Sequence, residues 1–309
     1  MSKTQSQRLA YGEELVALGA DNRDIVVLEA DLGKSTMSCL FQQAYPDRYF
    51  EMGIAEQNML SMAAGLAASG KIAFASTFAV FAAGRAFDQI RQTIAIGNLN
   101  VKICGSSSGL SDFGDGSTHQ TIEDVATMSV IPNMTVLTPC DAAETRQAVH
   151  AAAEIEGPVY IRVVRNDVPD YISEGDTFEL GKMRVLKDGN DVVLFASGTM
   201  VEASMKAAET LEKDGISAKV VNVSTMKPFD EEAVLTLSKE AKAIVTAEEH
   251  SYIGGLASKV ALALKKSKVP MDYVAIEDKF GQSAHSVKEL MDHYGLTEQN
   301  IVAKVKGLL

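Results

Sequence analysis

Short apolar runs alternate with segments of helical spacing along nearly the whole chain, and this alternation limits the fold more than any other feature. The run from Ile25 to Ala30 follows a segment, residues 7–19, whose leucines recur at helical spacing. Runs that are apolar on both faces are typical of strands in a parallel sheet, because helices cover both sides of such a sheet. We expect further strands at 72–77, 99–104, 135–137, 159–164, 191–196, 217–223, 242–248 and 272–277, and further helices at 55–69, 82–97, 142–155, 200–213, 230–239 and 255–266. The pattern therefore predicts an α/β fold with doubly wound sheets.

The alternation loosens between Arg165 and Gly189, where prolines and glycines gather. Such a stretch is typical of a linker between domains. A chain of 309 residues, 46% of them hydrophobic, is long enough to bury two cores. We therefore expect a first domain at 1–170, a linker at 171–189 and a second domain at 190–309.

The composition excludes some classes of partner and of structure. The chain has 41 acidic and 29 basic residues, a net charge of −12, so a nucleic-acid backbone is not an expected partner. Its three cysteines form no C-x-x-C pair, which argues against a disulfide framework or a zinc site and fits a reducing cytoplasm. The first residues contain no apolar signal core.

The apolar stretch from Met59 to Gly84 resembles a membrane span at first sight. Ser69–Lys71 divides it into two pieces that are each too short to cross a bilayer. Its alanines, glycines and serines favour a buried helix, a turn and a buried strand that pack closely against another subunit. We therefore expect no contact with a membrane.

The segment Gly53–Met59 places one carboxyl group, that of Glu56, among apolar neighbours. Burial disfavours the charged form of a carboxyl group, so such a group can share a proton with a basic ring nitrogen. The simpler interpretation is a glutamate in the first turn of a helix, where the helix dipole favours negative charge.

A second segment that could take part in chemistry is the loop Gly105–Gly116, which is rich in glycine and serine and follows a predicted strand. Asp115 and His119 lie four residues apart at its end. Histidine exchanges protons near neutral pH, and long glycine-rich loops are often functional. The simpler interpretation is a polar loop with a capping histidine.

With these two segments, the chain resembles the C-terminal half of a transketolase. The resemblance covers nearly the whole chain and depends on four segments in the same order. These are Arg48–Asn58 (RYFEMGIAEQN), Ser76–Phe78 (STF), Gly114–Gln120 (GDGSTHQ) and Glu248–Leu256 (EEHSYIGGL). It implies a pyrimidine-binding domain with a parallel sheet, followed by a transketolase C-terminal-like domain with a mostly parallel sheet.

The resemblance implies that the chain binds part of thiamine diphosphate. Glu56 matches the glutamate that exchanges a proton with N1′ of the aminopyrimidine ring. Phe78 and Phe81 match the aromatic residues that stack on this ring, and Asp31 matches a carboxylate near the cofactor. Aromatic walls suit a flat heteroaromatic ring. Core filling is the competing interpretation for Phe81.

The resemblance also implies a site for sugar phosphates. Asp115 and His119 match residues that recognise hydroxyl groups and the reacting carbonyl, so the implied catalytic residues are Glu56 and His119. Arg8, Ser35 and Arg165 match positions that bind the phosphate, for which two guanidinium groups and a hydroxyl are suitable ligands. A solvated N-terminal arginine is the alternative interpretation of Arg8.

One position departs from the family pattern. Transketolases usually have a phosphate-binding histidine in the loop before Gly-Asp-Gly, and here the matching position is Ser107, within Ser106–Ser108. We therefore expect an incomplete or rearranged phosphate site and a non-standard substrate, such as a branched ketose phosphate.

Gly114–Gly116 also resembles the magnesium motif of thiamine enzymes, in which an asparagine follows after roughly 25–30 residues. Asn133 is too close, and His119 follows instead of an apolar helix, so we expect no metal ligand on this chain. A diphosphate-binding domain is not recognisable. The chain therefore resembles one half of a split enzyme, whose N-terminal partner subunit holds the diphosphate and Mg²⁺ in an α2β2 heterotetramer.

The activity implied by the resemblance is transfer of a two-carbon ketol (glycolaldehyde) unit between sugar phosphates. A 1-deoxyxylulose-5-phosphate synthase-like enzyme and the β subunit of a 2-oxo acid dehydrogenase are the alternatives. Asp115 and His119 argue against the dehydrogenase subunit. Intact Glu56 and His119 argue against a non-catalytic paralogue.

Overall fold

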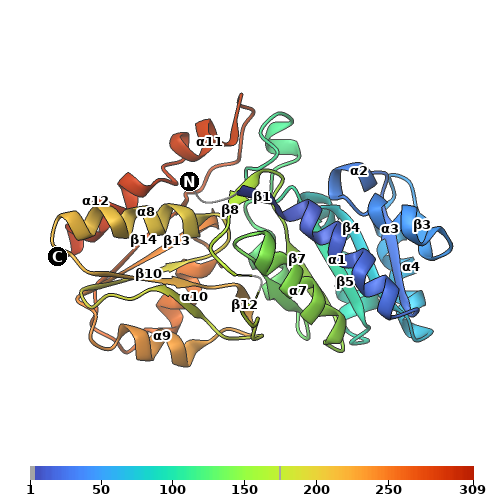
Figure 1. The fold of residues 1–309 in the computed structure, drawn as a ribbon, viewed down its shortest axis with the longest axis horizontal. Coiled ribbons are helices and arrows are strands. Elements are labelled where there is room, and N and C mark those ends of the chain that lie inside the picture. The colour runs from blue at the N-terminus through green and yellow to red at the C-terminus, as the bar shows by residue number, and fades with distance from the viewer. Residues whose placement is uncertain (1–3, 174) are drawn as a thin grey trace.

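The computed structural model describes residues 4–173 and 175–309 and consists of two lobes, each built around a sheet (Figure 1). Both sheets are mostly parallel, so the predicted α/β fold is confirmed. Residues 1–3 of the proposed first domain and residue 174 of the proposed linker lie outside the described residues.

The first lobe contains a seven-stranded sheet in the order β12-β6-β7-β5-β4-β2-β3. All neighbours in it are parallel except β12 and β6. The strands are β2 (Ile25–Glu29), β3 (Tyr49–Glu51), β4 (Ile72–Phe78), β5 (Val101–Ser106), β6 (Thr135–Leu137), β7 (Val159–Arg162) and β12 (Thr225–Lys227). Because β12 belongs to the second half of the chain, the second half completes one edge of this sheet.

Helices cover both faces of the first sheet. On one face, α1 (Gln7–Asp21) and α7 (Ala142–Glu154) pack against each other (Figure 1). The other face is covered by α4 (Glu56–Ala68) and α6 (Asp124–Ser129), within a second hydrophobic cluster. Shorter elements are α2 (Gly33–Thr36), α3 (Cys39–Ala44), η1 (Pro46–Arg48) and η4 (Gly116–Thr118).

The helix expected at 82–97 is not one regular α-helix. Two π-helical segments, η2 (Phe81–Arg85) and η3 (Ile90–Ala95), lie on either side of the short α5 (Phe87–Gln89). A π-helical turn widens the helix and redirects side chains, and such turns are frequent at functional sites. Here, Phe81 and Arg85 lie at the two ends of η2.

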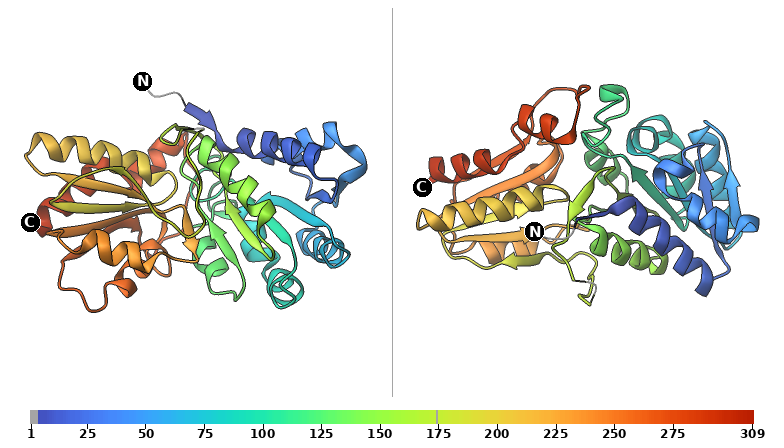
Figure 2. Two further views of the ribbon diagram at one scale, coloured as in Figure 1. Left: turned by 60° about the horizontal axis from the view of Figure 1, so that its bottom comes forward. Right: turned by 45° about the horizontal axis from the view of Figure 1, so that its top comes forward.

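The second lobe contains a five-stranded sheet in the order β14-β13-β10-β11-β9, in which only β9 is antiparallel. The strands are β9 (Arg184–Lys187), β10 (Val192–Ala196), β11 (Ala218–Asn222), β13 (Ala243–Ser251) and β14 (Met271–Ile276). Two helices, α8 (Met200–Lys213) and α12 (Glu298–Leu308), pack on one side, with α11 (Val287–His293) near them (Figure 2). The helices on the opposite side are α9 (Glu231–Ser238) and α10 (Leu256–Ala263).

Two short strands that the sequence pattern did not predict lie at the junction of the lobes. They are β1 (Thr4–Ser6) and β8 (Asp167–Pro169), and they pair antiparallel. The division at 1–170, 171–189 and 190–309 stays a proposal, with β9 lying inside the proposed linker and pairing with β11 of the second sheet.

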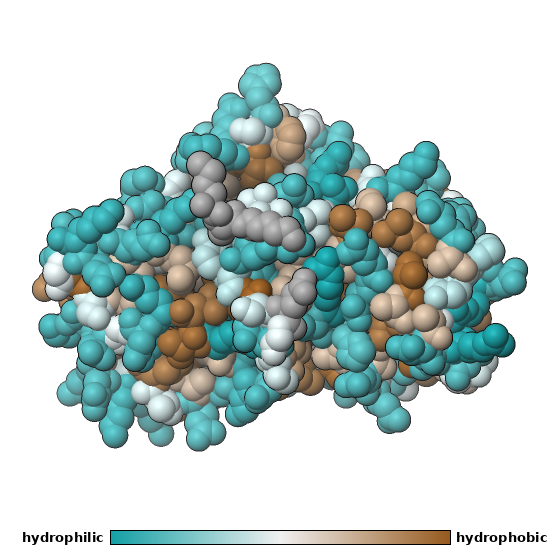
Figure 3. Space-filling view, in the orientation of Figure 1, coloured by the Kyte–Doolittle hydropathy of each residue, from teal (hydrophilic) through white to brown (hydrophobic). Residues whose placement is uncertain are grey.

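The face of the molecule shown in Figure 3 is mostly hydrophilic, with apolar areas on both lobes. Large apolar side chains that are exposed include Ile54, Met62, Val130 and Phe280. In the described part of the chain, every helix is too short or too polar to cross a membrane.

The first sheet also buries a carboxyl group, that of Glu29, whose pKa burial raises from 4.5 to about 7 although Thr36 and Ser38 donate to it. Between pH 4.5 and about 7, Glu29 is therefore protonated in the folded chain and ionised in the unfolded chain. The free energy of unfolding falls as the pH rises across this range. We expect Glu29→Gln to remove from this pH dependence a contribution on the order of 3 kcal/mol. Urea denaturation of both proteins across this range measures it, and parallel pH profiles would show that Glu29 titrates normally.

Candidate active site

The carboxylate of Glu56 lies at the first position of α4 and is only 1% exposed. Both of its oxygens accept from Nη1 of Arg85, each at 2.8 Å. The sequence analysis did not identify Arg85, although it is the single charged residue within 72–87 and that isolation was a usable signal. Glu56 is thus buried as expected, and it has a charged partner that the motif did not reveal.

An aromatic wall adjoins this pair. The rings of Phe78 and Phe81 are stacked, with centroids 6.1 Å apart and planes inclined by 15°. The guanidinium carbon of Arg85 lies 4.3 Å from the centroid of Phe81. The ring of His119 meets Phe81 edge-on at 5.4 Å and Phe78 at 6.3 Å. The structure therefore connects Glu56, through Arg85 and Phe81, with Phe78 and His119.

Three buried hydroxyl groups lie at the carboxyl ends of β4, which ends at Phe78 of this wall, and of the neighbouring β5. The Oγ atoms of Thr77, Ser106 and Ser107 have no hydrogen-bond partner among the described residues. Buried hydroxyls without partners are costly, so such a group of them fits a position where a ligand is bound. Ser107 adopts a left-handed backbone conformation, with φ of 50°.

Together, these residues fit an aminopyrimidine ring. A buried carboxylate is suited to exchange a proton with a ring nitrogen, and stacked phenylalanines are suited to hold the flat ring. Among residues 4–173 and 175–309, no group of three or more His, Cys, Asp and Glu is arranged to hold a metal ion.

The three residues matched to phosphate binding come together from separate elements. Arg8, in the first turn of α1, donates through Nη1 to the carbonyl of Ser35 at 2.7 Å. Its Nε donates to the carbonyl of Arg165, which follows β7, at 3.1 Å. Burial lowers the pKa of Arg8, and the positive charge of Arg165 lowers it further. The sequence analysis missed the partner of Arg165, which is Asp112, at 3.0 Å.

The loop that carries Asp115 and His119 is anchored by the second lobe. Oε1 of Glu249, in β13, accepts from the backbone N–H of Leu110 at 2.6 Å, and Oε2 accepts from Thr199 at 2.6 Å. Gly109 has φ of +63°, and a Cβ there would lie 2.4 Å from Glu249. Asp115 is exposed, whereas His119 is half-buried. The loop is therefore fixed at its base and open at its tip.

Asp31 lines a cavity whose lining does not include the residues of the aromatic wall. This cavity has a volume of about 440 Å³ and is also lined by Ser35, Tyr49 and Glu51. The backbone N–H of Asp31 donates to Glu51 at 2.8 Å, and the φ of Asp31 is 60°. The structure thus places Asp31 beside Ser35, on the side of the proposed phosphate ligands.

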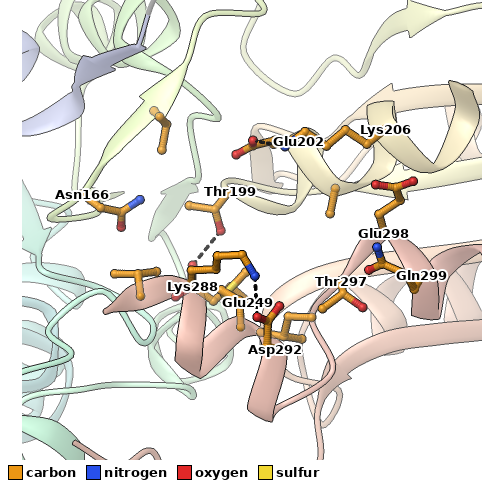
Figure 4. Close-up of a pocket in the computed structure, with 15 residues that line it drawn as sticks. Asn166, Thr199, Glu202, Lys206, Glu249, Lys288, Asp292, Thr297, Glu298 and Gln299 are labelled. Atoms are coloured by element: carbon orange, nitrogen blue, oxygen red, sulfur yellow. Dashed lines mark hydrogen bonds and ion pairs between the residues drawn. The ribbon is translucent and has the colours of Figure 1, made fainter. Parts of the chain in front are cut away.

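A separate cavity of about 430 Å³ lies between Asn166 and the helices of the second lobe (Figure 4). Glu249 and Thr199 line it, as do Lys288 and Asp292, which form an ion pair. It contains none of the predicted site residues. The candidate active site is therefore assigned from the chemistry of its side chains, and this cavity is not part of it.

The two lobes match known family models. Residues 3–170 match the transketolase pyrimidine-binding domain, and residues 181–301 match the transketolase C-terminal domain. The chain belongs to the transketolase family.

Three similar proteins show how the chain relates to this family. It is 43% identical to a 6-deoxy-6-sulfo-D-fructose transketolase subunit, SqwH, of Clostridium sp. MSTE9, over 96% of this chain and 92% of that protein. It is 36% identical to an apulose-4-phosphate transketolase subunit of Phocaeicola vulgatus, over 95% of this chain and 94% of that protein. A solved split-gene transketolase, described as an inactive β4 tetramer, is 48% identical with a TM-score of 0.90, over 99% of both chains.

The pairing of Glu56 with Arg85 predicts a measurable coupling energy. Arg85→Met leaves the buried carboxylate without its donor, and we expect a loss of about 1–2 kcal/mol in the free energy of unfolding, since Arg85 is partly exposed. In a Glu56→Gln background, the same substitution should cost far less. Arg91→Met is the matched control, because Arg91 is an exposed arginine of the neighbouring η3. Equal losses in both backgrounds, measured by urea denaturation, would contradict the coupling.

Proposed function

We propose that this chain is the C-terminal subunit of a thiamine diphosphate-dependent transketolase that transfers a two-carbon ketol unit between sugar phosphates or closely related sugars. The observation that carries the proposal is the cluster in which Arg85 joins Glu56 to Phe81, and Phe81 contacts Phe78 and His119. Thiamine diphosphate, when bound, would supply an acidic carbon able to act as a nucleophile toward a carbonyl group.

Each residue of the cluster has a role suited to its position. Glu56, once it is released by Arg85, holds or gives the proton at N1′ of the aminopyrimidine. Phe78 and Phe81 hold the ring by stacking and exclude water. His119 lies edge-on to this wall, at the base of an exposed loop tip, where it can bind the carbonyl oxygen or a hydroxyl of the sugar. We assign Asp115, which is exposed on the same loop, to accept from sugar hydroxyls.

The far end of the sugar is proposed to bind near Arg8, Ser35 and Arg165, which the structure gathers in one place. Two related proteins are named for different substrates, 6-deoxy-6-sulfo-D-fructose and apulose-4-phosphate. Ser107, in place of the family's histidine, leaves room beside the sugar chain. These observations support a non-standard ketose as the substrate of this chain.

We further propose that the diphosphate and Mg²⁺ are held by an N-terminal partner subunit in an α2β2 assembly. The similarity to a split-gene transketolase supports a separate partner, and the β4 description of that protein fits self-association. Ile54 and Met62, which are 75% and 45% exposed near Glu56, offer apolar surface for such contacts. The free thiols of Cys39, Cys104 and Cys140 support a cytoplasmic location.

The split arrangement predicts that the purified chain alone is catalytically silent. With thiamine diphosphate, Mg²⁺ and a panel of ketose donors, we expect no ketol transfer until a partner with the diphosphate site is added. Light scattering should show a dimer or tetramer of the isolated chain and a larger species with the partner. Turnover by this chain alone would contradict the split-enzyme proposal.

The role of Glu56 predicts the effect of Glu56→Gln in the reconstituted enzyme. An amide cannot exchange a proton with N1′, so the rate should fall by about 10²–10⁴-fold. The decisive measurement is hydrogen–deuterium exchange at C2 of the bound cofactor by NMR, with cofactor affinity measured in parallel. Unchanged exchange in a variant that still binds the cofactor would remove Glu56 from this role.

A further inference from the structure

We infer that Asp112 determines specificity by making the Arg8–Arg165 site select a singly charged sugar tail over a phosphate dianion. The inference rests on the proposed function, because it requires the far end of a sugar to reach Arg165. It concerns the charge of the substrate tail, which the proposed function leaves open.

The carboxylate of Asp112 is held firmly against Arg165. Asp112 is 2% exposed, and its Oδ2 accepts from Nη1 of Arg165 at 3.0 Å. Its backbone carbonyl accepts from Nε2 of Gln120 at 3.1 Å and from the N–H of Gly116 at 3.2 Å. These bonds fix the residue within the anchored loop. A bound tail that uses Arg165 must therefore share the guanidinium with Asp112.

Carboxylates near the two guanidinium groups also reduce the positive charge that a dianion would meet. Arg8 and Arg165 supply two guanidinium groups that act on each other, and the exposed Lys34 lies next to Ser35. The carboxylates of Asp112 and Asp167 both act on Arg8, and Asp115 acts on Asp112. The two guanidinium groups are thus offset by the carboxylates of Asp112 and Asp167, and Asp115 lies close to Asp112. Burial raises the pKa of Asp112 and the nearby Asp115 carboxylate raises it as well, against the opposing effect of Arg165, so burial and Asp115 both disfavour negative charge at this place.

A phosphate ester brings a charge of about −1.5 to −2 at neutral pH into these surroundings. A sulfonate, a sulfate ester or a carboxylate brings a single negative charge and still accepts from guanidinium N–H groups. The hydroxyl group of Ser35 can add a hydrogen bond but no charge. The singly charged tail is therefore the better match for Arg8 and Arg165 while Asp112 stays in place.

The test uses the reconstituted enzyme and one aldose acceptor esterified at its terminal hydroxyl with either phosphate or sulfate, which have similar shapes and differ in charge. The measured quantity is the sulfate-to-phosphate ratio of kcat/KM. We expect the wild-type enzyme to favour sulfate. In Asp112→Asn, the ratio should shift toward phosphate by about ten- to hundredfold, the effect expected for a hydrogen bond to a charged group.

Two further variants control this experiment. Asp167→Asn removes an exposed carboxylate near Arg8, and it should shift the ratio by about fivefold at most. Asp112→Glu keeps the charge and should keep the wild-type preference even if both rates fall. Since each ratio is taken within one variant, partial misfolding does not change it.

The outcomes separate the two proposals. A wild-type preference for phosphate, or the same ratio in wild type and Asp112→Asn, would overturn the inference while ketol transfer itself persists. Absence of transfer from every donor to every acceptor by the complete assembly would instead overturn the proposed function.

Discussion

The buried carboxylate of Glu249 is the interaction on which the site's geometry depends. It comes from the second lobe, is 2% exposed, and is satisfied by a backbone N–H of the loop at Leu110 and by the hydroxyl of Thr199. Burial raises its pKa, so the group is costly to keep there without these donors. The loop that carries Asp112, Asp115 and His119 is thus shaped by a residue of the other lobe. The geometry of the candidate site therefore depends on both lobes.

Much of the fold could be predicted because buried parallel strands leave a strong signal. The runs at 25–30, 72–77 and 191–196 became β2, β4 and β10 within two residues at each end. Strands such as β12 could not be predicted, because Thr225–Lys227 is three residues long and exists through pairing with a distant segment. The helix expected at 82–97 failed for a related reason, since periodicity does not distinguish an α-helix from one with π-helical turns.

The residues of the candidate site also differ in whether the sequence alone could reveal them. Glu56, Phe78 and His119 belong to local motifs, and motifs are visible in a sequence. Arg85 and Asp112 matter through partners that lie 29 and 53 residues away, so only the folded chain reveals them. Both pairings change how Glu56 and Arg165 are interpreted, because each of these two charges meets an opposite charge. The roles of the predicted residues are still proposals.

The strand β12 has a consequence for how this molecule can be divided. It leaves the second lobe to pair with β6 at the edge of the first sheet. A first lobe expressed alone would present β6 with unpaired backbone groups, which is a template for association with other chains. The lobes are therefore not interchangeable modules. Recombination of domains between relatives at the linker would need to carry β12 with the sheet that it completes, or supply a new edge.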